Sequence, residues 1–329
     1  MEVIRYSKKI ILPNKKRYIA LGVFDGVHLG HQKLIKQTVD KAKKNDGISI
    51  VVTFDPHPGK IINPKSNVFL LTTLEERISL IKELDVDIFL IIKFNKMMSK
   101  MMPEDFIRKI LVDSLQVKEL FVGFNYKFGF QGKGNTDILR EYSKFYKFKT
   151  NILKPITENH TIISSTRIKE YVKLGEIEKA RKLLGHDITI LGKVISGKGR
   201  GKRLINFATA NIETTPDKLI PVNGVYLVEI KIDNRKYYGL MNIGVKPTFR
   251  ETERTIEVHI INFNRKIYTK KVVVNILQKI REEKFFKHPS LLKKQIENDI
   301  LIARKMIEQY RDTVFRLKGI MVYDKIMRI

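Results

Sequence analysis

The first half of the chain alternates short apolar runs with stripes of apolar residues at helical spacing. The first run, at residues 18–21, is followed from residue 29 to residue 42 by apolar positions with the period of an α-helix. Residues 48–54 form a continuous apolar run bounded by turn-forming residues, which is typical of a buried strand. Further strands are predicted at residues 86–94, 119–123 and 150–153, and further helices at 74–84, 103–111, 136–146 and 176–184. Buried strands that alternate with helices indicate a doubly wound α/β domain with a parallel sheet.

After residue 186 the pattern changes to short β-rich runs without helical stripes between them. Residues 225–231 alternate between the two faces of a strand, and Asp233-Asn234 predicts a hairpin turn. The other predicted strands cover residues 188–195, 237–243, 255–261 and 271–276, and a last helix covers 289–310. We therefore predict an α/β domain over residues 1–185 and a small antiparallel β-barrel with a terminal helix over 186–315. Residues 316–329 form a C-terminal extension to which the sequence assigns no role.

The composition fits two globular domains in the cytoplasm. A chain of 329 residues with 43% hydrophobic residues can build two cores. It contains no cysteine, which excludes disulfides and thiolate metal sites. The first residues lack the sustained apolar segment of a secretory signal, and the apolar run at 88–92 is too short to span a bilayer. We expect a cytoplasmic protein with no membrane partner.

The formal net charge of +28 would attract nucleic acid, an anionic membrane or phosphorylated small molecules. Most of the 63 basic residues are lysines, and they are spread along the whole chain. Proteins that read nucleic acid gather arginine and aromatic residues on one face or in one motif, and the sequence contains no such motif. We interpret the charge as a bias of composition and expect no nucleic-acid partner.

The junction between the first predicted strand and the first helix, residues 22–31, carries the first candidate site. Its glycines, Gly22, Gly26 and Gly30, fit neither the G-x-G-x-x-G pattern nor a Walker A motif. A strand, a glycine turn and a helix in this order present free N–H groups and the positive end of the helix dipole, which suit phosphate. His28 and His31 lie three residues apart at the helix start, so both imidazoles point to one side. The spacing alone leaves open a cap with a surface residue, a pair of metal ligands, or donors to a phosphate.

Three further loops hold polar residues at expected strand ends. Residues 54–58 place His57 between two prolines, and residues 122–129 place Asn125 among aromatic residues. In residues 163–170, a hydroxyl of Ser164, Ser165 or Thr166 can cap the next helix, and Arg167 adds a cation for phosphate. A rigid turn, an aromatic core plug and an ordinary helix cap are the alternative interpretations of these loops.

The second half carries two candidate sites. The basic, glycine-rich segment 197–211 suits backbone contact with phosphates. Near its end, Thr209 and Asn211 lie two residues apart, so in an extended chain they offer two oxygens to a cation such as Mg²⁺. Glu257 lies between apolar residues of a predicted strand, where a carboxylate could accept a proton from a substrate hydroxyl. A solvated basic turn and an outward-facing strand glutamate are the alternatives.

Taken in order, these motifs resemble those of the prokaryotic bifunctional riboflavin kinase/FMN adenylyltransferase (FAD synthetase) family over residues 17–310. The segment 22–31 is similar to the signature of the nucleotidylyltransferase superfamily, and 206–211 is similar to the kinase's Pro-Thr-Ala-Asn signature. The resemblance implies a Rossmann-like N-terminal nucleotidylyltransferase domain that adenylylates FMN to FAD and releases pyrophosphate. It implies a C-terminal domain that phosphorylates riboflavin to FMN. ATP as co-substrate, Mg²⁺ or another divalent cation, ADP and the flavins are the implied ligands.

The resemblance also implies roles for individual residues. The implied catalytic residues are Glu257, His28 and His31. The implied ATP and phosphate contacts are Gly22, Phe24, Asp25, Gly26, Gly30, Ser164, Ser165, Thr166, Arg167, Gly197, Gly199, Gly201 and Lys202. The implied flavin contacts are Phe54, His57, Asn125, Asn242 and Arg281, and the implied metal ligands are Thr209 and Asn211.

One departure from the family pattern concerns the kinase. Where the family has Gly, an apolar residue and Pro before Thr-Ala-Asn, this chain has Asn206, Phe207 and Ala208. The metal ligands are retained, so we expect kinase activity with altered affinity for ATP or metal. Two alternatives stay open: an enzyme with only the adenylyltransferase fully active, and a basic nucleic-acid-binding protein on a nucleotidyltransferase-like scaffold.

Overall fold

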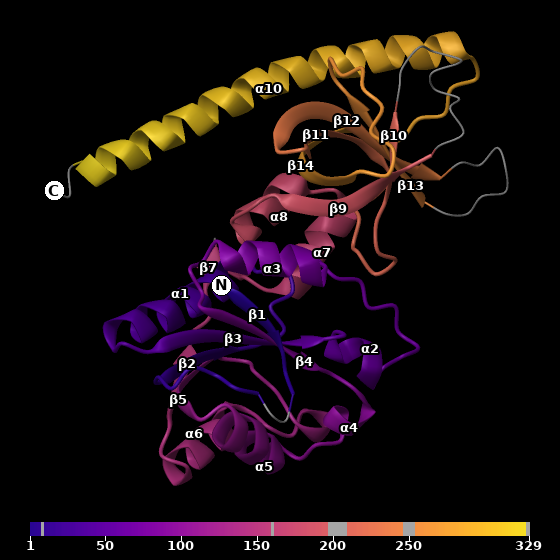
Figure 1. The fold of residues 1–329 in the computed structure, drawn as a ribbon. Helices are drawn as coiled ribbons and strands as arrows, with labels where there is room; N and C mark the ends of the chain where they lie inside the picture. The colour runs from indigo at the N-terminus through magenta and orange to yellow at the C-terminus, as the bar shows by residue number, and fades with distance from the viewer. Residues whose placement is uncertain (8–9, 159–160, 197–208, 246–253, 327–329) are drawn as a thin grey trace. The chain divides into compact units, whose positions relative to one another are not determined.

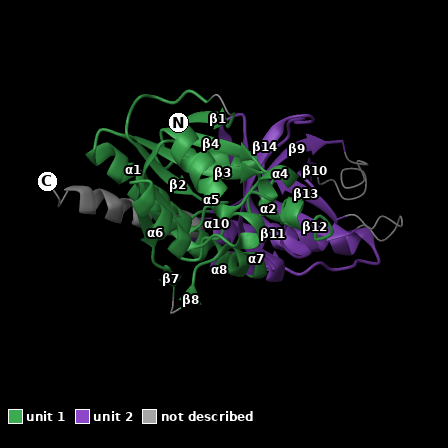
Figure 2. Ribbon diagram, turned by 90° about the horizontal axis from the view of Figure 1, so that it is seen from below, with its two compact units in different colours: residues 1–170, 180–186, 217–219 green, residues 171–179, 187–216, 220–329 purple. Residues whose placement is uncertain are grey.

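The computed structural model describes residues 1–329 apart from 8–9, 159–160, 197–208, 246–253 and 327–329, with side chains described as far as residue 309. The chain forms two compact units, which are coloured separately in Figure 2. Unit 1 comprises residues 1–170, 180–186 and 217–219, and unit 2 comprises residues 171–179, 187–216 and 220–329. None of the helices in the described part of the chain has the length and apolar character that a membrane span requires.

Unit 1 is built on a parallel sheet, as predicted, and the sheet has six strands. Its strands are β1 (Glu2–Arg5), β2 (Arg17–Leu21), β3 (Ile48–Asp55), β4 (Ile88–Lys93), β5 (Val117–Gly123) and β6 (Lys149–Leu153). The strand order is β1-β4-β3-β2-β5-β6. The sequence did not predict β1, because this edge strand is largely exposed and has no apolar run.

Helices cover both faces of this sheet (Figure 1). On one face, α1 (Leu29–Lys44) and α3 (Leu74–Lys82) bury apolar residues that include Ile35 and Ile81. On the other face, α5 (Pro103–Phe106), the π-helix η1 (Ile107–Ser114) and α6 (Thr136–Phe145) pack against a second core cluster. The remaining elements are α2 (Pro58–Ile62), α4 (Lys96–Ser99), η2 (Phe130–Gly132), β7 (Thr157–Glu158) and β8 (Thr161–Ile162). The helices α7 (Ser165–Leu174) and α8 (Ile177–Leu184) each have residues in both units.

The strand order places a topological switch point between β2 and β5. From β2 the chain adds β3 and β4 in one direction, whereas β5 and β6 extend the sheet in the other. In open α/β sheets, ligands bind at the carboxyl ends of the strands at such a point, because the flanking loops diverge there. The loops that follow β2 and β5 start at residues 22 and 124, so the fold brings two of the predicted motifs to this edge.

Unit 2 contains a closed antiparallel barrel with the strand order β10-β13-β12-β11-β14-β9. Its strands are β9 (Ile188–Ile195), β10 (Ala210–Glu213), β11 (Gly224–Ile232), β12 (Arg235–Val245), β13 (Arg254–Ile260) and β14 (Lys271–Arg281). The predicted hairpin turn is confirmed: Asp233 and Asn234 join β11 to β12 with φ angles of 48° and 64°. Two residues in the left-handed region match the right-handed twist of a hairpin, and Asp and Asn tolerate this conformation.

The terminal helix α10 (Pro289–Ile326) packs on the barrel and is longer than the predicted helix over 289–310. Ala303 and Ile307 of α10 lie in one apolar cluster with Leu227 and Leu240 of the barrel. Beside this cluster, the Arg281 guanidinium donates to both carboxylate oxygens of Asp299 at 2.8–3.0 Å, and the Asp299 side chain is only 2% exposed. The ion pair therefore joins the end of β14 to α10 in a largely dry environment.

Replacing Asp299 with alanine should destabilise unit 2 by about 3 kcal/mol, because the largely buried Arg281 would lose its carboxylate. Chemical denaturation followed by circular dichroism measures this loss. Glu297→Ala is the matched control, since Glu297 is exposed on the same helix. An equal effect of the two substitutions would contradict a structural role for the Arg281–Asp299 pair.

Candidate functional site

The loop between β2 and α1, residues 22–28, has an unusual backbone. Phe24, Gly26 and Val27 have φ angles of 54°, 84° and 40°. Positive φ is costly for the two side-chain-bearing residues, and such strain is concentrated at functional sites. Gly26 also has no room for a side chain, because a Cβ there would lie 2.7 Å from Leu71 Cδ1. The loop is therefore a defined structure rather than a simple connection.

His28 and His31 come together at the first turn of α1. His28 is the N-cap, and its Nδ1 accepts a hydrogen bond from the backbone N–H of His31 at 3.3 Å. The two rings are stacked, with centroids 3.6 Å apart and planes inclined by 17°. Because His28 Nδ1 is an acceptor, its neutral ring carries the proton at Nε2. His31 Nδ1 is buried and finds no hydrogen-bond partner among the residues that the structure describes.

Burial keeps both imidazoles neutral at physiological pH. Desolvation lowers the pKa of His28 to about 4, although the nearby Asp25 carboxylate partly opposes this shift. Desolvation also lowers the pKa of His31 well below its ordinary value, and the neighbouring His28 and Arg77 act in the same direction. Two neutral, stacked rings at a helix N-terminus can donate hydrogen bonds to a phosphate without the cost of burying a positive charge.

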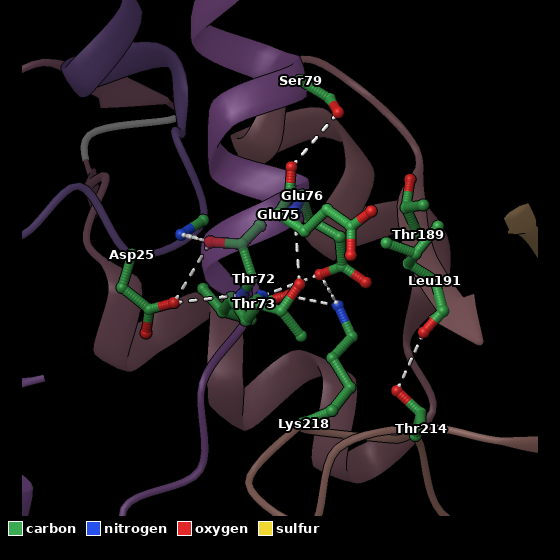
Figure 3. Close-up of polar contacts among 12 residues, drawn as sticks. Asp25, Thr72, Thr73, Glu75, Glu76, Ser79, Thr189, Leu191, Thr214 and Lys218 are labelled. Carbon is green, nitrogen blue, oxygen red and sulfur yellow. Dashed lines mark hydrogen bonds and ion pairs between the residues drawn. The ribbon is translucent and has the colours of Figure 1, made fainter. Parts of the chain in front are cut away.

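Asp25 connects the loop to two other parts of unit 1. Its Oδ1 accepts a hydrogen bond from the Thr72 N–H at 3.1 Å, and its Oδ2 lies 2.7 Å from Lys169 Nζ (Figure 3 shows the Thr72 contact). The Asp25 carbonyl oxygen accepts a hydrogen bond from Ser165 Oγ at 2.8 Å. The structure thus brings the predicted segment 163–170 against the predicted loop 22–31.

Other side chains hold the carbonyl and N–H groups of the same loop. The Gly26 N–H donates to Thr72 Oγ1 at 2.9 Å, and the Gly26 carbonyl oxygen lies 2.9 Å from His186 Nε2. The Arg77 guanidinium, almost completely buried, donates to the Val23 carbonyl oxygen at 2.8 Å. The Gly22 N–H donates to the Val52 carbonyl oxygen of β3 at 3.2 Å, and the side-chain contacts satisfy further backbone groups of the loop.

The sequence interpretation missed several of these residues. Thr73 and Glu76 form a capping box at the start of α3, and the motif Thr-x-x-Glu was present as a signal in the sequence. It would have located the turn that contains Thr72. Arg77 and Lys169 gave no signal in the sequence. Arg77 lies inside an amphipathic helix and Lys169 lies one turn into a second helix, and at such positions both look like ordinary helix residues.

Other predicted residues of unit 1 cap helices, pack in the core or are exposed. Ser164 Oγ accepts a hydrogen bond from the Arg167 N–H at 3.3 Å, so it caps α7, while Thr166 is exposed. His57 is the N-cap of α2, where its Nδ1 accepts from the Gly59 N–H at 3.0 Å. Phe54 is buried in the core against Phe94, with ring centroids 5.8 Å apart. Asn125 is exposed in the loop after β5.

In unit 2, strand pairing places four predicted residues in one row. Asn211 on β10 is opposite Glu257 on β13, and Glu257 is opposite Asn242 on β12. The row continues through Val225 on β11 to Arg281 on β14. Residues that are directly opposite in neighbouring strands project to the same side of the sheet. The barrel therefore gathers an amide, a carboxylate and a second amide on one side, and Arg281 lies at the end of this row, beside an irregularity in the β11–β14 pairing.

Several predicted residues lie outside the described residues. These are Gly197, Gly199, Gly201, Lys202, Asn206 and Ala208. Thr209, the first described residue after them, is exposed and precedes β10. Among the described residues, no group of three or more His, Cys, Asp or Glu side chains is placed to hold a metal ion.

Comparison with known proteins gives matches over both units. A sequence profile described as FAD synthetase matches residues 11–167, and one described as riboflavin kinase matches residues 184–307. A bifunctional riboflavin kinase/FMN adenylyltransferase from Buchnera aphidicola subsp. Schizaphis graminum is 39% identical over 93% of this chain and 98% of its own. The enzyme of the same description from Listeria monocytogenes is 37% identical over 90% of this chain and 94% of its own.

A solved structure also matches nearly the whole fold. The crystal structure of a protein from Streptococcus pneumoniae, described as a macrolide-efflux protein, has a TM-score of 0.84 and 29% sequence identity. The match covers 92% of this chain and 99% of that chain. The likeness supports the predicted architecture of a parallel-sheet domain and a β-barrel with a terminal helix.

The depressed pKa of His28 predicts how the stability of unit 1 depends on pH. Unfolded His28 takes up a proton as the pH falls below about 6.5, whereas the folded ring stays neutral down to about pH 4. The contribution of His28 to folding stability is therefore present above pH 6.5 and is lost as the pH drops toward 4. His28→Asn keeps an N-cap acceptor and removes this titration, so between pH 7 and pH 5 it should lose about 2 kcal/mol less stability than the wild type. Denaturation series at the two pH values measure the difference. Identical losses in both proteins would show that His28 is not buried in its neutral form.

Proposed function

The chain belongs to the family of bifunctional riboflavin kinase/FMN adenylyltransferases, and on this premise we propose where each reaction takes place and which residues carry it. The enzyme uses ATP to phosphorylate riboflavin to FMN, and it uses ATP to adenylylate FMN to FAD with release of pyrophosphate. Because both profiles match, neither a single activity nor nucleic-acid binding is favoured as an alternative.

Unit 1 carries the adenylyl transfer, with the loop 22–31 and the start of α7 around the phosphates of ATP. A phosphate oxygen of FMN attacks the α-phosphorus, and the bond from this phosphorus to pyrophosphate breaks. No covalent contribution from the protein is needed, so positioning and hydrogen-bond donors supply the catalysis. The observation that carries the proposal is the pair of neutral, stacked rings of His28 and His31 at a helix N-terminus.

The side chains around that pair have supporting roles. His28 Nε2–H and the ring of His31 donate to the phosphate oxygens on which negative charge gathers. Ser165 binds the Asp25 carbonyl oxygen and so fixes the loop, while Thr166 and Arg167 at the start of α7 hold the departing pyrophosphate. His57 and Asn125, in loops that follow β3 and β5, contact FMN, and Phe54 supports these loops from the core.

Unit 2 carries the phosphorylation of riboflavin, with Glu257 as general base. The carboxylate takes the proton of the riboflavin 5′-hydroxyl, whose oxygen attacks the γ-phosphorus of ATP as ADP leaves. The register that sets Glu257 between Asn211 and Asn242 supports this role. Asn242 and Arg281, farther along the same row, contact the flavin, and Gly197, Gly199, Gly201 and Lys202 contact the phosphates of ATP.

Thr209 and Asn211 fit a magnesium ion by their chemistry and their place. A hydroxyl and an amide oxygen are hard donors of the kind that Mg²⁺ takes, and Asn211 lies directly opposite the Glu257 carboxylate. Mg²⁺ commonly has few protein ligands and completes its coordination with phosphates and water, which agrees with so small a donor set. When bound, the ion would neutralise charge on the phosphates of ATP. Since ATP serves both reactions, we place the enzyme in the cytoplasm.

Two substitutions test the assignment of one reaction to each unit. His28→Ala should lower FAD formation from FMN by roughly 100-fold and leave FMN formation from riboflavin intact, because only the adenylyl site loses a donor.

Glu257→Gln should lower FMN formation by at least roughly 100-fold and leave the conversion of added FMN to FAD intact. Chromatographic separation of the flavins measures both rates. Glu213→Gln, at an exposed position of β10, is the control for the second substitution. If either active-site substitution abolished both steps in a folded protein, the two-site assignment would be wrong.

Asn211→Ala tests the proposed metal ligands. It should raise the Mg²⁺ concentration at half-maximal riboflavin phosphorylation by roughly 10-fold, because one of the protein's donors is lost. The Mg²⁺ requirement of FMN adenylylation in the same protein should not change. Initial rates of the two reactions over a series of Mg²⁺ concentrations give both values. A lower kinase rate with an unchanged Mg²⁺ requirement would argue against Asn211 as a ligand.

A further inference from the structure

The segment Asp217–Leu219 belongs to unit 1, although it follows β10 and precedes β11 of the barrel. It pairs with the chain before α3: the Leu70 N–H donates to the Asp217 carbonyl oxygen at 2.8 Å, and the Leu219 N–H donates to the Leu70 carbonyl oxygen at 2.8 Å. Lys60 on α2 forms an ion pair with Asp217. Residues 217–219 nevertheless lie inside the stretch that the riboflavin kinase profile matches, 184–307.

Lys218 is the buried centre of this segment. Its side chain is 0% exposed, and its Nζ donates to Glu76 Oε2 at 2.6 Å and to the Leu71 carbonyl oxygen at 2.7 Å. The side chain of Glu76 is itself only 3% exposed. A buried charge is tolerated only when it is paired and hydrogen-bonded, so each of the two groups depends on the other.

The Lys218–Glu76 pair leads directly to the loop 22–28 (Figure 3). Glu76 Oε2 also accepts the Thr73 N–H at 2.9 Å, and Thr73 Oγ1 accepts the Glu76 N–H at 3.2 Å. The preceding residue, Thr72, donates its N–H to Asp25 and accepts the N–H of Gly26. Lys218 therefore fixes Glu76, Glu76 fixes the start of α3, and the start of α3 fixes the loop that carries the histidines.

We propose that Lys218 is a positioning residue of the FMN adenylyltransferase site, although its position in the sequence assigns it to the kinase. The inference rests on the proposed function of the loop 22–31. Lys218 touches neither histidine; it acts through Glu76 and Thr72 on the geometry of the loop. Loss of the cation would leave the buried Glu76 carboxylate without the charge of Lys218 and would weaken its hold on the capping box.

The test uses the full-length chain with Lys218→Met, which keeps much of the side-chain length and removes the charge. The kcat for FAD formation from FMN, measured at saturating substrates, should fall roughly 10- to 100-fold, as expected when reacting groups are displaced by about 1 Å. FMN formation from riboflavin should keep its wild-type rate. Near-ultraviolet circular dichroism at the assay temperature shows whether the variant is folded. Lys231→Met, at an exposed position of β11 within the same profile match, is the control and should leave both rates unchanged.

A second variant keeps the test decisive if Lys218→Met folds poorly. Lys218→Met combined with Glu76→Gln removes both charges of the buried pair, and the Gln oxygen can still accept the Thr73 N–H. It should recover most of the lost FAD formation. The inference is overturned if Lys218→Met lowers kinase activity and spares FAD formation, or if the double variant recovers nothing. His28→Ala, measured in parallel, distinguishes a wrong site from a wrong role of Lys218. If His28→Ala leaves FAD formation intact, the proposed site is wrong. If His28→Ala lowers FAD formation and Lys218→Met does not, only the role of Lys218 is refuted.

Discussion

The buried carboxylate of Asp25 is the interaction on which the first site depends. A loop with positive φ at Phe24 and Val27 would relax if it were free. Asp25 prevents this because a charge with 5% side-chain exposure must be paired: one oxygen takes the Thr72 N–H and the other lies against Lys169. The partners come from α7 and from the turn before α3, which are separated widely in the sequence. The site at the switch point of the sheet therefore depends on contacts from several distant segments of unit 1.

The second site depends on strand register instead. An antiparallel ladder fixes which residues are opposite one another, and a shift by one residue would turn every side chain to the other side of the sheet. In the barrel, the register from β10 through β13 to β12 places Asn211, Glu257 and Asn242 side by side. The Arg281–Asp299 ion pair closes the far end of the row against α10. The two sites therefore differ in origin: one is a loop held by side chains, and the other is a row set by backbone hydrogen bonds.

The sequence alone predicted the architecture of both units, because buried strands and amphipathic helices leave periodic patterns. It also identified the loop 22–31, since strand, glycine turn and helix follow one another without interruption. It could not predict that Lys218, in the middle of barrel sequence, pairs with Glu76, because long-range ion pairs leave no local pattern. The edge strand β1 was missed for a related reason: an exposed strand needs no apolar run. The roles of Phe54, His57, Asn125 and the other predicted ligand contacts stay predictions.

The central claim is that one chain transfers two different parts of ATP to the same flavin, and isotopic labelling tests it most directly. Riboflavin would be incubated with Mg²⁺ and ATP labelled with ³²P at either the γ- or the α-phosphorus, and the flavins would be separated. FMN should carry only the γ label, and FAD should carry one phosphorus from the γ position and one from the α position. FAD that lacks the γ label would contradict the account. So would a reaction in which FMN forms but never receives the α-labelled adenylyl group.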